Sequence, residues 1–500
     1  MSGLFKLAIL LVLLVFACSL VFLGFNFLEK VPNFIDSKDV RNCPKLSGRI
    51  VSNKDSSYNK DRLGANYYAS KKKFPAVIVY CQNTQDVQNA VLYAKCKKLP
   101  IRIRSGGHNH EGYSTGDGVV LIDVSEMKGL KLDTTTNTAT IEPGINNLEL
   151  YSQLFKQGLT HVGGTCSEVG LSGLALSGGM GPLLRKEGLT CDTLISVDMV
   201  AASGEVIHAT KDNEHKDLLW ALCGGGAGNF GVVTSMEIKV YPATDVTWFN
   251  IGWNWDQPIE QVIGAWLDFY MKPDSKNWFS HLDIWAKPFP AEKQKKQPVK
   301  ALGVFWGTPE EAREQLSHLL SIGKPQIEKL ELVKWDEAIK LFEDSTAVFL
   351  TEIPEYKSSG AFVMDQLPPE ATKIIVNALR ESTSPYFNVL FEPMGGAISD
   401  IPPSNTAFFY RDAKFFINYT SQWLNENEDQ KQKAELEGLR DRLLPYTVGD
   451  YVGNPDPDLK DYLTAYYGDN VDQLKQVKCK YDPENIFQFE QSIPPGSGCK

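Results

Sequence analysis

The chain has 500 residues, which at roughly 150 residues per domain predicts about two to four domains. Hydrophobic residues make up 43% and charged residues 22%, a globular composition that excludes disorder, collagen and coiled coil as the main state. With 51 Lys and Arg against 61 Asp and Glu, the net charge of −10 gives the surface no electrostatic reason to bind nucleic acid.

The first thirty residues contain a long apolar segment. Residues 7–28 carry no charge, and a helix of that length spans about 33 Å, enough for a hydrocarbon core of ~30 Å. Within residues 1–30 a signal anchor competes with a signal peptide cleaved near Ala17-Cys18-Ser19. The anchor fits better, because apolar residues would remain beyond that site, and a buried core helix is the third interpretation. We therefore expect a chain that is secreted, or held in a membrane by residues 7–28, with its remainder outside the cytoplasm.

Eight of the nine cysteines lie outside this segment, and no CxxC pair occurs. The sequence therefore predicts no zinc ribbon, no redox dithiol and no metal site. An oxidising compartment would permit disulfides among the eight.

Residues 70–242 alternate short apolar strands with helices. The expected strands span 76–80, 101–104, 119–124, 196–201 and 232–240. A helix is expected over 84–99, capped by Thr84 and ended by Pro100, and another over 148–157, ended by Gly158.

The composition changes from residue 243, and eight of the ten tryptophans fall between Trp248 and Trp335. Apolar and polar residues alternate over 249–255, which predicts an amphipathic strand. Trp253 and Trp255 either stack on a sugar or belong to the core, and core is the commoner role. Helices are expected near 258–271, 309–322, 369–381 and 459–480. This pattern predicts a second domain in which helices cover a sheet.

Three glycine clusters carry the chemistry. The first is Arg104–Asn109, directly after a strand, where consecutive glycines let backbone amides turn toward an anion. The second runs over 163–181 and the third over 223–231. No GxGxxG or Walker fingerprint occurs, and three clusters so close together favour the approach of backbone to a large flat ligand over ordinary turns.

The stretch from Tyr67 to Pro242 resembles the PCMH-type FAD-binding domain of the vanillyl-alcohol-oxidase type. The chain is most similar to the berberine-bridge-enzyme-like and oligosaccharide-oxidase group, through IRIRSGGHNHEG, GTCSEVGLSG, SGGMG, LLRKEGLTCD, GGGAGNFGVV, AYYG and YDPENIF. The resemblance implies an α+β fold: a two-subdomain FAD-binding domain over 70–242 and an antiparallel-sheet substrate domain covered by helices over 243–447. A C-terminal segment, 448–495, would return to the FAD domain.

The resemblance implies FAD attached twice, through His108 and Cys166. Taken alone, His108 could be a polar turn residue and Cys166 a small buried hydrophobe. Further cofactor contacts are implied for residues of the glycine clusters and for two C-terminal residues. They are Arg104, Ser105, Gly106, Gly107, Asn109, Gly164, Thr165, Val169, Gly170, Gly173, Leu174, Ser177, Gly178, Gly228, Phe230, Gly231, Val233, Tyr467 and Asn485.

In this group a tyrosine of a Tyr-x-Asn-Tyr segment takes the substrate proton. Here the segment begins at Tyr451, but its second tyrosine is replaced by Asn454. The candidates for the base are therefore Tyr451, Tyr410 and Tyr419, in that order. The base's usual partner on the substrate sheet aligns with Asn418, which also heads an Asn-x-Thr sequon.

The resemblance also implies a disulfide between Cys43 and Cys96; the alternative is two free thiols, and the other cysteines have no assigned partner. Val169 would line the path of O₂ to the flavin. The function implied is an exported FAD-linked oxidase that converts a small alcohol or sugar to a carbonyl compound or lactone and releases hydrogen peroxide. A dehydrogenase with another electron acceptor and a non-catalytic flavin-loaded surface protein are the alternatives, and the second gains weight from Asn454.

Overall fold

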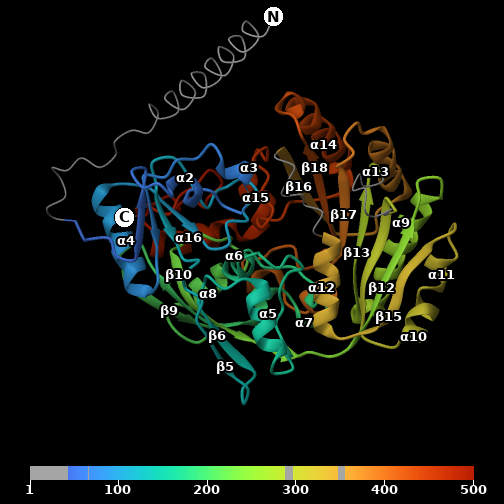
Figure 1. Cartoon of the computed structure of the whole chain (residues 1–500), viewed down its shortest axis with the longest axis horizontal. Helices are drawn as coiled ribbons and strands as arrows, with labels where there is room; N and C mark the ends of the chain where they lie inside the picture. Colours follow the sequence, from blue (N-terminus) through green and yellow to red (C-terminus); the bar gives the residue numbers. More distant parts are fainter. Residues whose placement is uncertain (1–42, 66, 288–296, 347–354, 500) are drawn as a thin grey trace, which may run out of the picture.

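The computed structural model describes residues 43–65, 67–287, 297–346 and 355–499. The segment 1–30, with its expected anchor or signal, lies outside these ranges. The described chain forms two parts that lie side by side, and the C-terminal helices return to the first part (Figure 1). This arrangement confirms the predicted α+β architecture.

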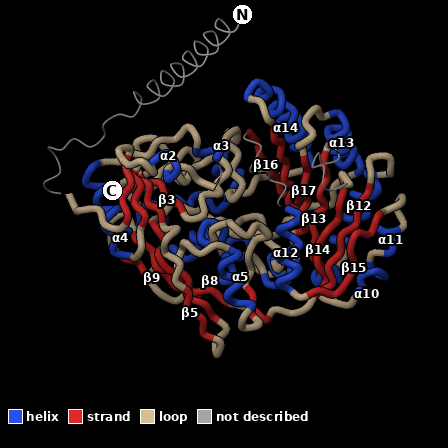
Figure 2. Tube along the Cα trace, viewed as in Figure 1, coloured by secondary structure: helices blue, strands red, loops and turns tan. Residues whose placement is uncertain are grey.

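The first part contains two main sheets and a short strand pair (Figure 2). One sheet has the order β1-β2-β4-β3, in which only β1 is antiparallel to its neighbour, and the other has the antiparallel order β5-β6-β10-β8-β9. Residues 77–80 are buried on both faces, as the strands of parallel sheets usually are. The strand bounds are β1 Arg49–Ser52, β2 Val77–Tyr80, β3 Ile101–Arg104, β4 Val120–Asp123, β5 Leu130–Asp133, β6 Thr138–Ile141, β7 Leu159–Thr160, β8 Leu194–Val200, β9 Val206–Thr210, β10 Val232–Lys239 and β11 Tyr241–Pro242.

The helices of this part lie between and beside these strands. They are α2 Tyr58–Asp61, α3 Tyr67–Ser70, α4 Thr84–Lys97, α5 Asn147–Phe155, α6 Leu171–Leu176, α7 Leu184–Glu187 and α8 Lys216–Leu222. The expected cap of α4 was wrong by one residue. The Asn83 side chain accepts the Asp86 amide, and Thr84 is the first helical residue.

The second part is one seven-stranded antiparallel sheet in the order β15-β12-β14-β13-β17-β18-β16. Its strands are β12 Val246–Trp253, β13 Trp278–Trp285, β14 Val299–Phe305, β15 Gln326–Val333, β16 Glu355–Val363, β17 Asn388–Pro393 and β18 Phe415–Trp423. Trp253 is fully buried in the core, as expected, and Trp255 packs against that core with part of its surface exposed.

One face of this sheet packs on helices, and the other faces the first part. The helices on the first of these faces are α9 Ile259–Tyr270, α10 Pro309–Gln315, α11 Ser317–Leu320, α13 Pro369–Glu381 and α14 Asp429–Leu443. The helix α12 Trp335–Thr346 lies on the other face (Figure 1), where Trp335 and Phe342 belong to the core that also contains residues of the first part. The single helix expected over 309–322 is thus two, and the one expected near 459–480 is α15 Tyr462–Tyr467 followed by α16 Val471–Tyr481. Gly468 separates the last two, because its φ of +49° is incompatible with a continuing helix.

The two parts share one buried core. It contains Leu171 and Phe230 of the first part, Trp248 and Phe416 of the second, and Tyr451 of the C-terminal segment. Alternation along β18 explains the division: Phe416 faces this shared core, whereas Phe415, Ile417 and Tyr419 face the helices on the other side of the sheet.

Candidate active site

Two glycine-rich loops touch where the predicted attachment residues lie. A Cβ on Gly106 would lie 2.5 Å from the Gly170 amide nitrogen, and a Cβ on Gly170 would lie 2.6 Å from that of Gly106. Only glycine allows this approach. The contact brings His108 next to the second loop, where its ring hydrogen-bonds the Glu168 backbone. Burial lowers the pKa of His108, so the imidazole is neutral at pH 7.

The start of α5 holds the loop that carries Cys166. The Asn147 side-chain amide donates to the Cys166 carbonyl at 3.0 Å, and its backbone amide donates to the Val169 carbonyl at 3.1 Å. Cys166 lies outside the disulfides, and its side chain is exposed although the residues on both sides of its loop are largely buried. Of the two predicted attachment residues, Cys166 is therefore exposed and His108 is partly exposed.

The residues beside these loops fit a flat cofactor. A Cβ on Gly173 would meet nothing within 4 Å, and one on Gly228 would meet only a ring carbon of Phe489 at 3.8 Å. Both glycines border open space, although α6 and the third cluster are mostly buried. Asn485 adds a buried Oδ1 with no hydrogen-bond partner among the described residues. Open space beside glycine backbone, and a buried acceptor without a partner, fit the binding of FAD.

Several residues predicted to contact the cofactor make contacts within the protein. The Arg104 guanidinium is buried against Asp123, with Nε 2.5 Å from Oδ2, so its side chain is not available to a phosphate. Phe230 and Val233 belong to the core. Gly231 is needed because a Cβ there would lie 2.5 Å from the Val200 carbonyl oxygen.

The remaining predicted cofactor residues divide between backbone support and the open side of the loops. Ser105 donates to the Pro143 carbonyl at 2.7 Å, Asn109 accepts the Tyr113 amide at 2.9 Å, and the Tyr467 hydroxyl donates to the Gly225 carbonyl at 3.0 Å. These three organise the loops. The partly exposed members are Gly107, Thr165, Val169 and Leu174, while Gly164, Ser177 and Gly178 are buried beneath them.

Tyr451 lies next to the second glycine cluster. Its hydroxyl accepts the Gly179 amide at 3.1 Å, and its ring packs edge-on against Phe408 and Phe416. Gly181, two residues beyond Gly179, packs so tightly on the Gly163 carbonyl that a Cβ would overlap it. Tyr451 is thereby linked, through short backbone contacts, to the loop that carries Cys166.

The structure does not bring the other two candidate tyrosines to this place. Tyr419 faces the helices on the far side of the sheet, because it neighbours Asn418 in β18 and adjacent residues point to opposite faces. The Tyr410 hydroxyl donates to the Ala465 carbonyl at 2.7 Å, and its ring stacks on Phe362. Asn418 does share the face of Phe416, with its Oδ1 accepting from Ser358 at 3.0 Å.

Glu392 on β17 is a further candidate site residue, which the sequence did not predict. It pairs across the sheet with Phe416, its charge acts on Tyr451, and burial raises its pKa to about 7. His281 on β13 lies beside it, but burial lowers the pKa of that imidazole to about 4, so it is uncharged at neutral pH. The sequence signal for Glu392 was an acidic residue at the end of a strand directly before Pro393-Met394-Gly395-Gly396.

Three disulfides stabilise the described chain. Cys43–Cys96 confirms the predicted pair, while Cys191–Cys223 and Cys479–Cys499 pair four cysteines that had no assigned partner. Cys81 is buried outside them. Among the residues with described positions, no helix is both long and apolar enough to cross a bilayer.

The fold and its paired glycine loops define an FAD-dependent oxidoreductase. Residues 75–210 match the FAD binding domain family model, and residues 450–494 match the berberine and berberine-like model. YgaK, an FAD-linked oxidoreductase of Bacillus subtilis, is 37% identical over 454 residues, which cover 90% of this chain and 98% of the relative. Berberine bridge enzyme-like 4 of Arabidopsis thaliana is 28% identical over 472 residues, covering 86% and 88%.

Among solved structures, a chitooligosaccharide oxidase superimposes with a TM-score of 0.79 at 26% identity, covering 90% of this chain and 98% of that one. The chain therefore belongs to the berberine-bridge-enzyme-like family of FAD-linked oxidoreductases.

Proposed function

We propose that the protein is an exported oxidase that removes a hydride from a CH–OH carbon of a carbohydrate or other small alcohol and forms hydrogen peroxide. The observation that carries this proposal is twofold: Glu392 and Asn418 share the sheet face of Phe416, and Tyr451, which packs on Phe416, hydrogen-bonds the glycine cluster that also contains Cys166. Bound FAD would supply the two-electron acceptor for the substrate hydride and would return the electrons to O₂.

Glu392 is the proton acceptor in this proposal. A general base works best when its pKa lies near the working pH, and the pKa of Glu392 is about 7. Burial raises the pKa of Tyr451 above its ordinary value, so this residue remains a neutral phenol. Because Gly179 already donates to its oxygen, the phenol proton is left to orient the substrate hydroxyl toward Glu392. Asn454 then need not act as a base.

Attachment of FAD through both His108 and Cys166 is supported by the contact of their loops. Acid denaturation tests it: the precipitated protein should stay yellow, and its peptide map should show flavin on both residues. A colourless pellet with free FAD in the supernatant would refute covalent attachment.

A carbohydrate substrate is supported by two findings. The sheet face near Glu392 bears hydroxyl and amide groups from Ser358, Asn418 and Thr420, which suit a polyol. The solved structure at 26% identity is named a chitooligosaccharide oxidase. The test is anaerobic reduction of the bound flavin by a panel of sugars and aromatic alcohols, followed by admission of air.

Each rival function has its own outcome in that test. Reduction by substrate without rapid reoxidation in air would favour a dehydrogenase with another acceptor. No reduction by any member of the panel, despite a full content of flavin, would favour a non-catalytic binding protein. Export is supported by the three disulfides, which persist in oxidising compartments, and membrane anchoring through residues 7–28 remains a proposal from the sequence.

A further inference from the structure

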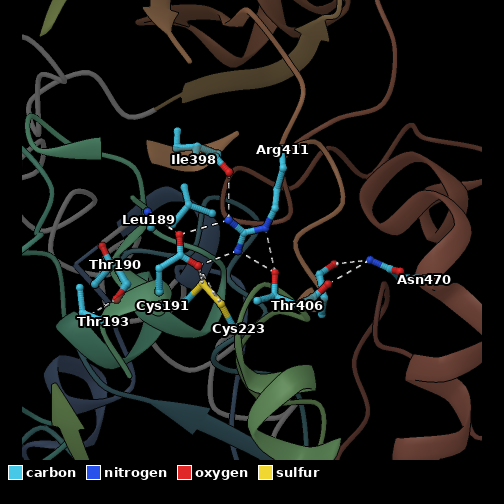
Figure 3. Close-up of a disulfide and its surroundings, with 12 residues drawn as sticks. Leu189, Thr190, Cys191, Thr193, Cys223, Ile398, Thr406, Arg411 and Asn470 are labelled. Atoms are coloured by element: carbon cyan, nitrogen blue, oxygen red, sulfur yellow. Dashed lines mark hydrogen bonds and ion pairs between the residues drawn. A yellow bond between two sulfur atoms is a disulfide. The ribbon is translucent and has the colours of Figure 1, made fainter. Parts of the chain in front are cut away.

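Asp192 accepts hydrogen bonds from both parts of the molecule, from Leu189 of the first and from Arg411 of the second; both partners are labelled in Figure 3. It belongs to the 3₁₀ helix Thr190–Thr193 of the first part. Its two oxygens accept the Arg411 guanidinium, at 2.6 Å from Nη2 and 3.2 Å from Nη1. Arg411 precedes β18 and is fully buried, and its other hydrogen bonds go to Thr406 and to the Ile398 carbonyl. This bidentate pair fixes Asp192 relative to the second part.

The Cys191–Cys223 disulfide lies against the same carboxylate. The Cys223 sulfur is 3.7 Å from Asp192 Oδ1, and the Cys191 sulfur is 4.0 Å from it. The bond joins the 3₁₀ helix that follows the second glycine cluster to the start of the third cluster. From there the Cys223 carbonyl accepts the Phe408 amide at 3.0 Å. We refer to Asp192, Arg411 and this disulfide together as the clamp.

The clamp is connected to Tyr451 through the backbone segment 178–179 and through the Phe408 ring. The Cys191 and Thr190 amides donate to the carbonyls of Gly178 and Gly179, each at 2.9 Å. Gly179 in turn donates its own amide to the Tyr451 hydroxyl. A Cβ on Gly178 would lie 2.8 Å from the Phe408 ring, which itself packs on Tyr451. Two routes, through Gly179 and through Phe408, therefore join the clamp to one phenol.

We infer that Asp192, Arg411 and the Cys191–Cys223 disulfide are positioning residues that hold the Gly179 amide on the Tyr451 hydroxyl. The inference rests on the role proposed above for Tyr451. None of the three contacts Tyr451 directly; they act through the segment 178–179 and through Phe408. Gly178 and Gly179 both have positive φ, and glycine has few conformational restraints of its own. The orientation of the Gly179 amide must therefore be fixed by contacts with other residues.

The hydrogen bond itself provides the measurement. An amide that donates to the phenol oxygen stabilises the phenolate and lowers its pKa, and this is the direction in which Gly179 acts on Tyr451. The Glu392 carboxylate acts in the opposite direction. Loss of the amide donor alone therefore raises the pKa of the phenol.

The experiment places 3,5-difluorotyrosine at position 451 of the full flavin-bearing chain, because this analogue ionises well below tyrosine. Its pKa is read by fluorine NMR in the otherwise native chain, in Asp192→Asn, and in Cys191→Ala with Cys223→Ala. The matched control removes the other unpredicted disulfide, through Cys479→Ala with Cys499→Ala, which ties α16 to the C-terminal tail. Hydrogen exchange of the peptide spanning 176–192 reports whether the clamp has opened.

The expected result is a rise of about 1 in the pKa of the labelled phenol in both clamp variants, together with faster exchange of 176–192 and no change in the control. An unchanged pKa in the clamp variants, or an equal rise in the control, would overturn the inference. If neither variant folds, the pKa of the labelled phenol is measured in Arg411→Lys and interpreted in the same way. Lysine keeps the positive charge but cannot form the bidentate hydrogen bonds of the guanidinium. The titration needs no turnover, so a wild type that reduces no flavin would refute the proposed function and leave this result standing.

Discussion

The Glu392 carboxylate lies 3.6 Å from the His281 imidazole, Oε1 to Nε2, on neighbouring strands of the sheet face that meets the first part. The pair is not an ion pair at neutral pH. Burial drives the pKa of the acid up to about 7 and that of the base down to about 4. Glu392 therefore changes its charge near pH 7 beside a neutral imidazole and the neutral Tyr451 phenol.

Glu392→Gln should strongly slow the transfer of the substrate hydride to the flavin. The side-chain amide of this variant cannot accept the substrate proton, so anaerobic flavin reduction should slow by about 10²- to 10⁴-fold. The wild-type rate should rise with pH to a plateau, with a midpoint near pH 7, and the variant should lack this limb. Stopped-flow reduction from pH 5 to 9 measures both. If the rate of the variant still rises with pH around pH 7, another residue is the base.

The same substitution should change how stability depends on pH. The folded-state pKa of Glu392 is raised from 4.5 to about 7, so its contribution is fully present below pH 4.5 and is lost as pH rises through 7. The loss is at most about 3 kcal/mol. Relative to wild type, Glu392→Gln should gain thermal stability between pH 5 and pH 8. The exposed Glu381→Gln on α13 is the control and should show no such gain.

Asn147→Ala should weaken attachment of the flavin at Cys166 while sparing His108. The substitution removes the donor to the Cys166 carbonyl, and His161, 3.3 Å away on the other side of the amide, cannot replace it. We expect the fraction of flavin on Cys166 to fall several-fold in a peptide mass map. The exposed Asn425→Ala is the control. Equal loss at both attachment residues would indicate a general defect of folding instead.

Val169→Leu should slow reoxidation by O₂ and leave reduction by substrate nearly unchanged. Val169 is partly exposed between Cys166 and the Gly170 that touches Gly106. In a close-packed region one added methylene narrows the space available to O₂. We therefore expect reoxidation to slow by about tenfold or more. Stopped-flow separates the two half-reactions. If wild-type reduced flavin reoxidises in air only over minutes, the oxidase proposal is wrong before the variant is made.

Residues 7–28 should direct export and remain attached. Cell fractionation with sequencing of the mature N-terminus measures both properties. A soluble secreted chain that begins near Leu20 would refute only the anchor. A cytosolic chain that begins at Met1 would refute export and would also leave the three disulfides without an oxidising compartment.

The glycine clusters and the short strands could be predicted, because their signals are local. Consecutive glycines such as Gly106-Gly107 and buried runs such as Val77–Tyr80 are visible in a few residues. The face of a strand is local as well. Strict alternation places Asn418 and Tyr419 on opposite faces of a strand, so at most one of them can face the first part, and the structure shows that Tyr419 faces the helices.

The raised pKa of Glu392 could not be predicted from such local signals. Its raised pKa depends on burial by residues far away in the sequence, and its neighbour His281 comes from a strand more than a hundred residues earlier. The same holds for Arg104, whose side chain is engaged by Asp123 across β3 and β4 and is therefore not available to a phosphate. Such assignments depend on tertiary packing, which no local pattern encodes.

The disulfides at the two ends of the described chain have a practical consequence. Cys43 is tied to α4 and Cys499 to α16, and Figure 1 shows these helices on the side of the molecule away from the seven-stranded sheet. A purification tag, an electrode surface or a second enzyme joined at the C-terminal end, next to Cys499, would therefore be held beside the first part (Figure 1). The seven-stranded sheet would lie away from such an attachment, so preparations immobilised through the C-terminal end should retain the activity of the free chain.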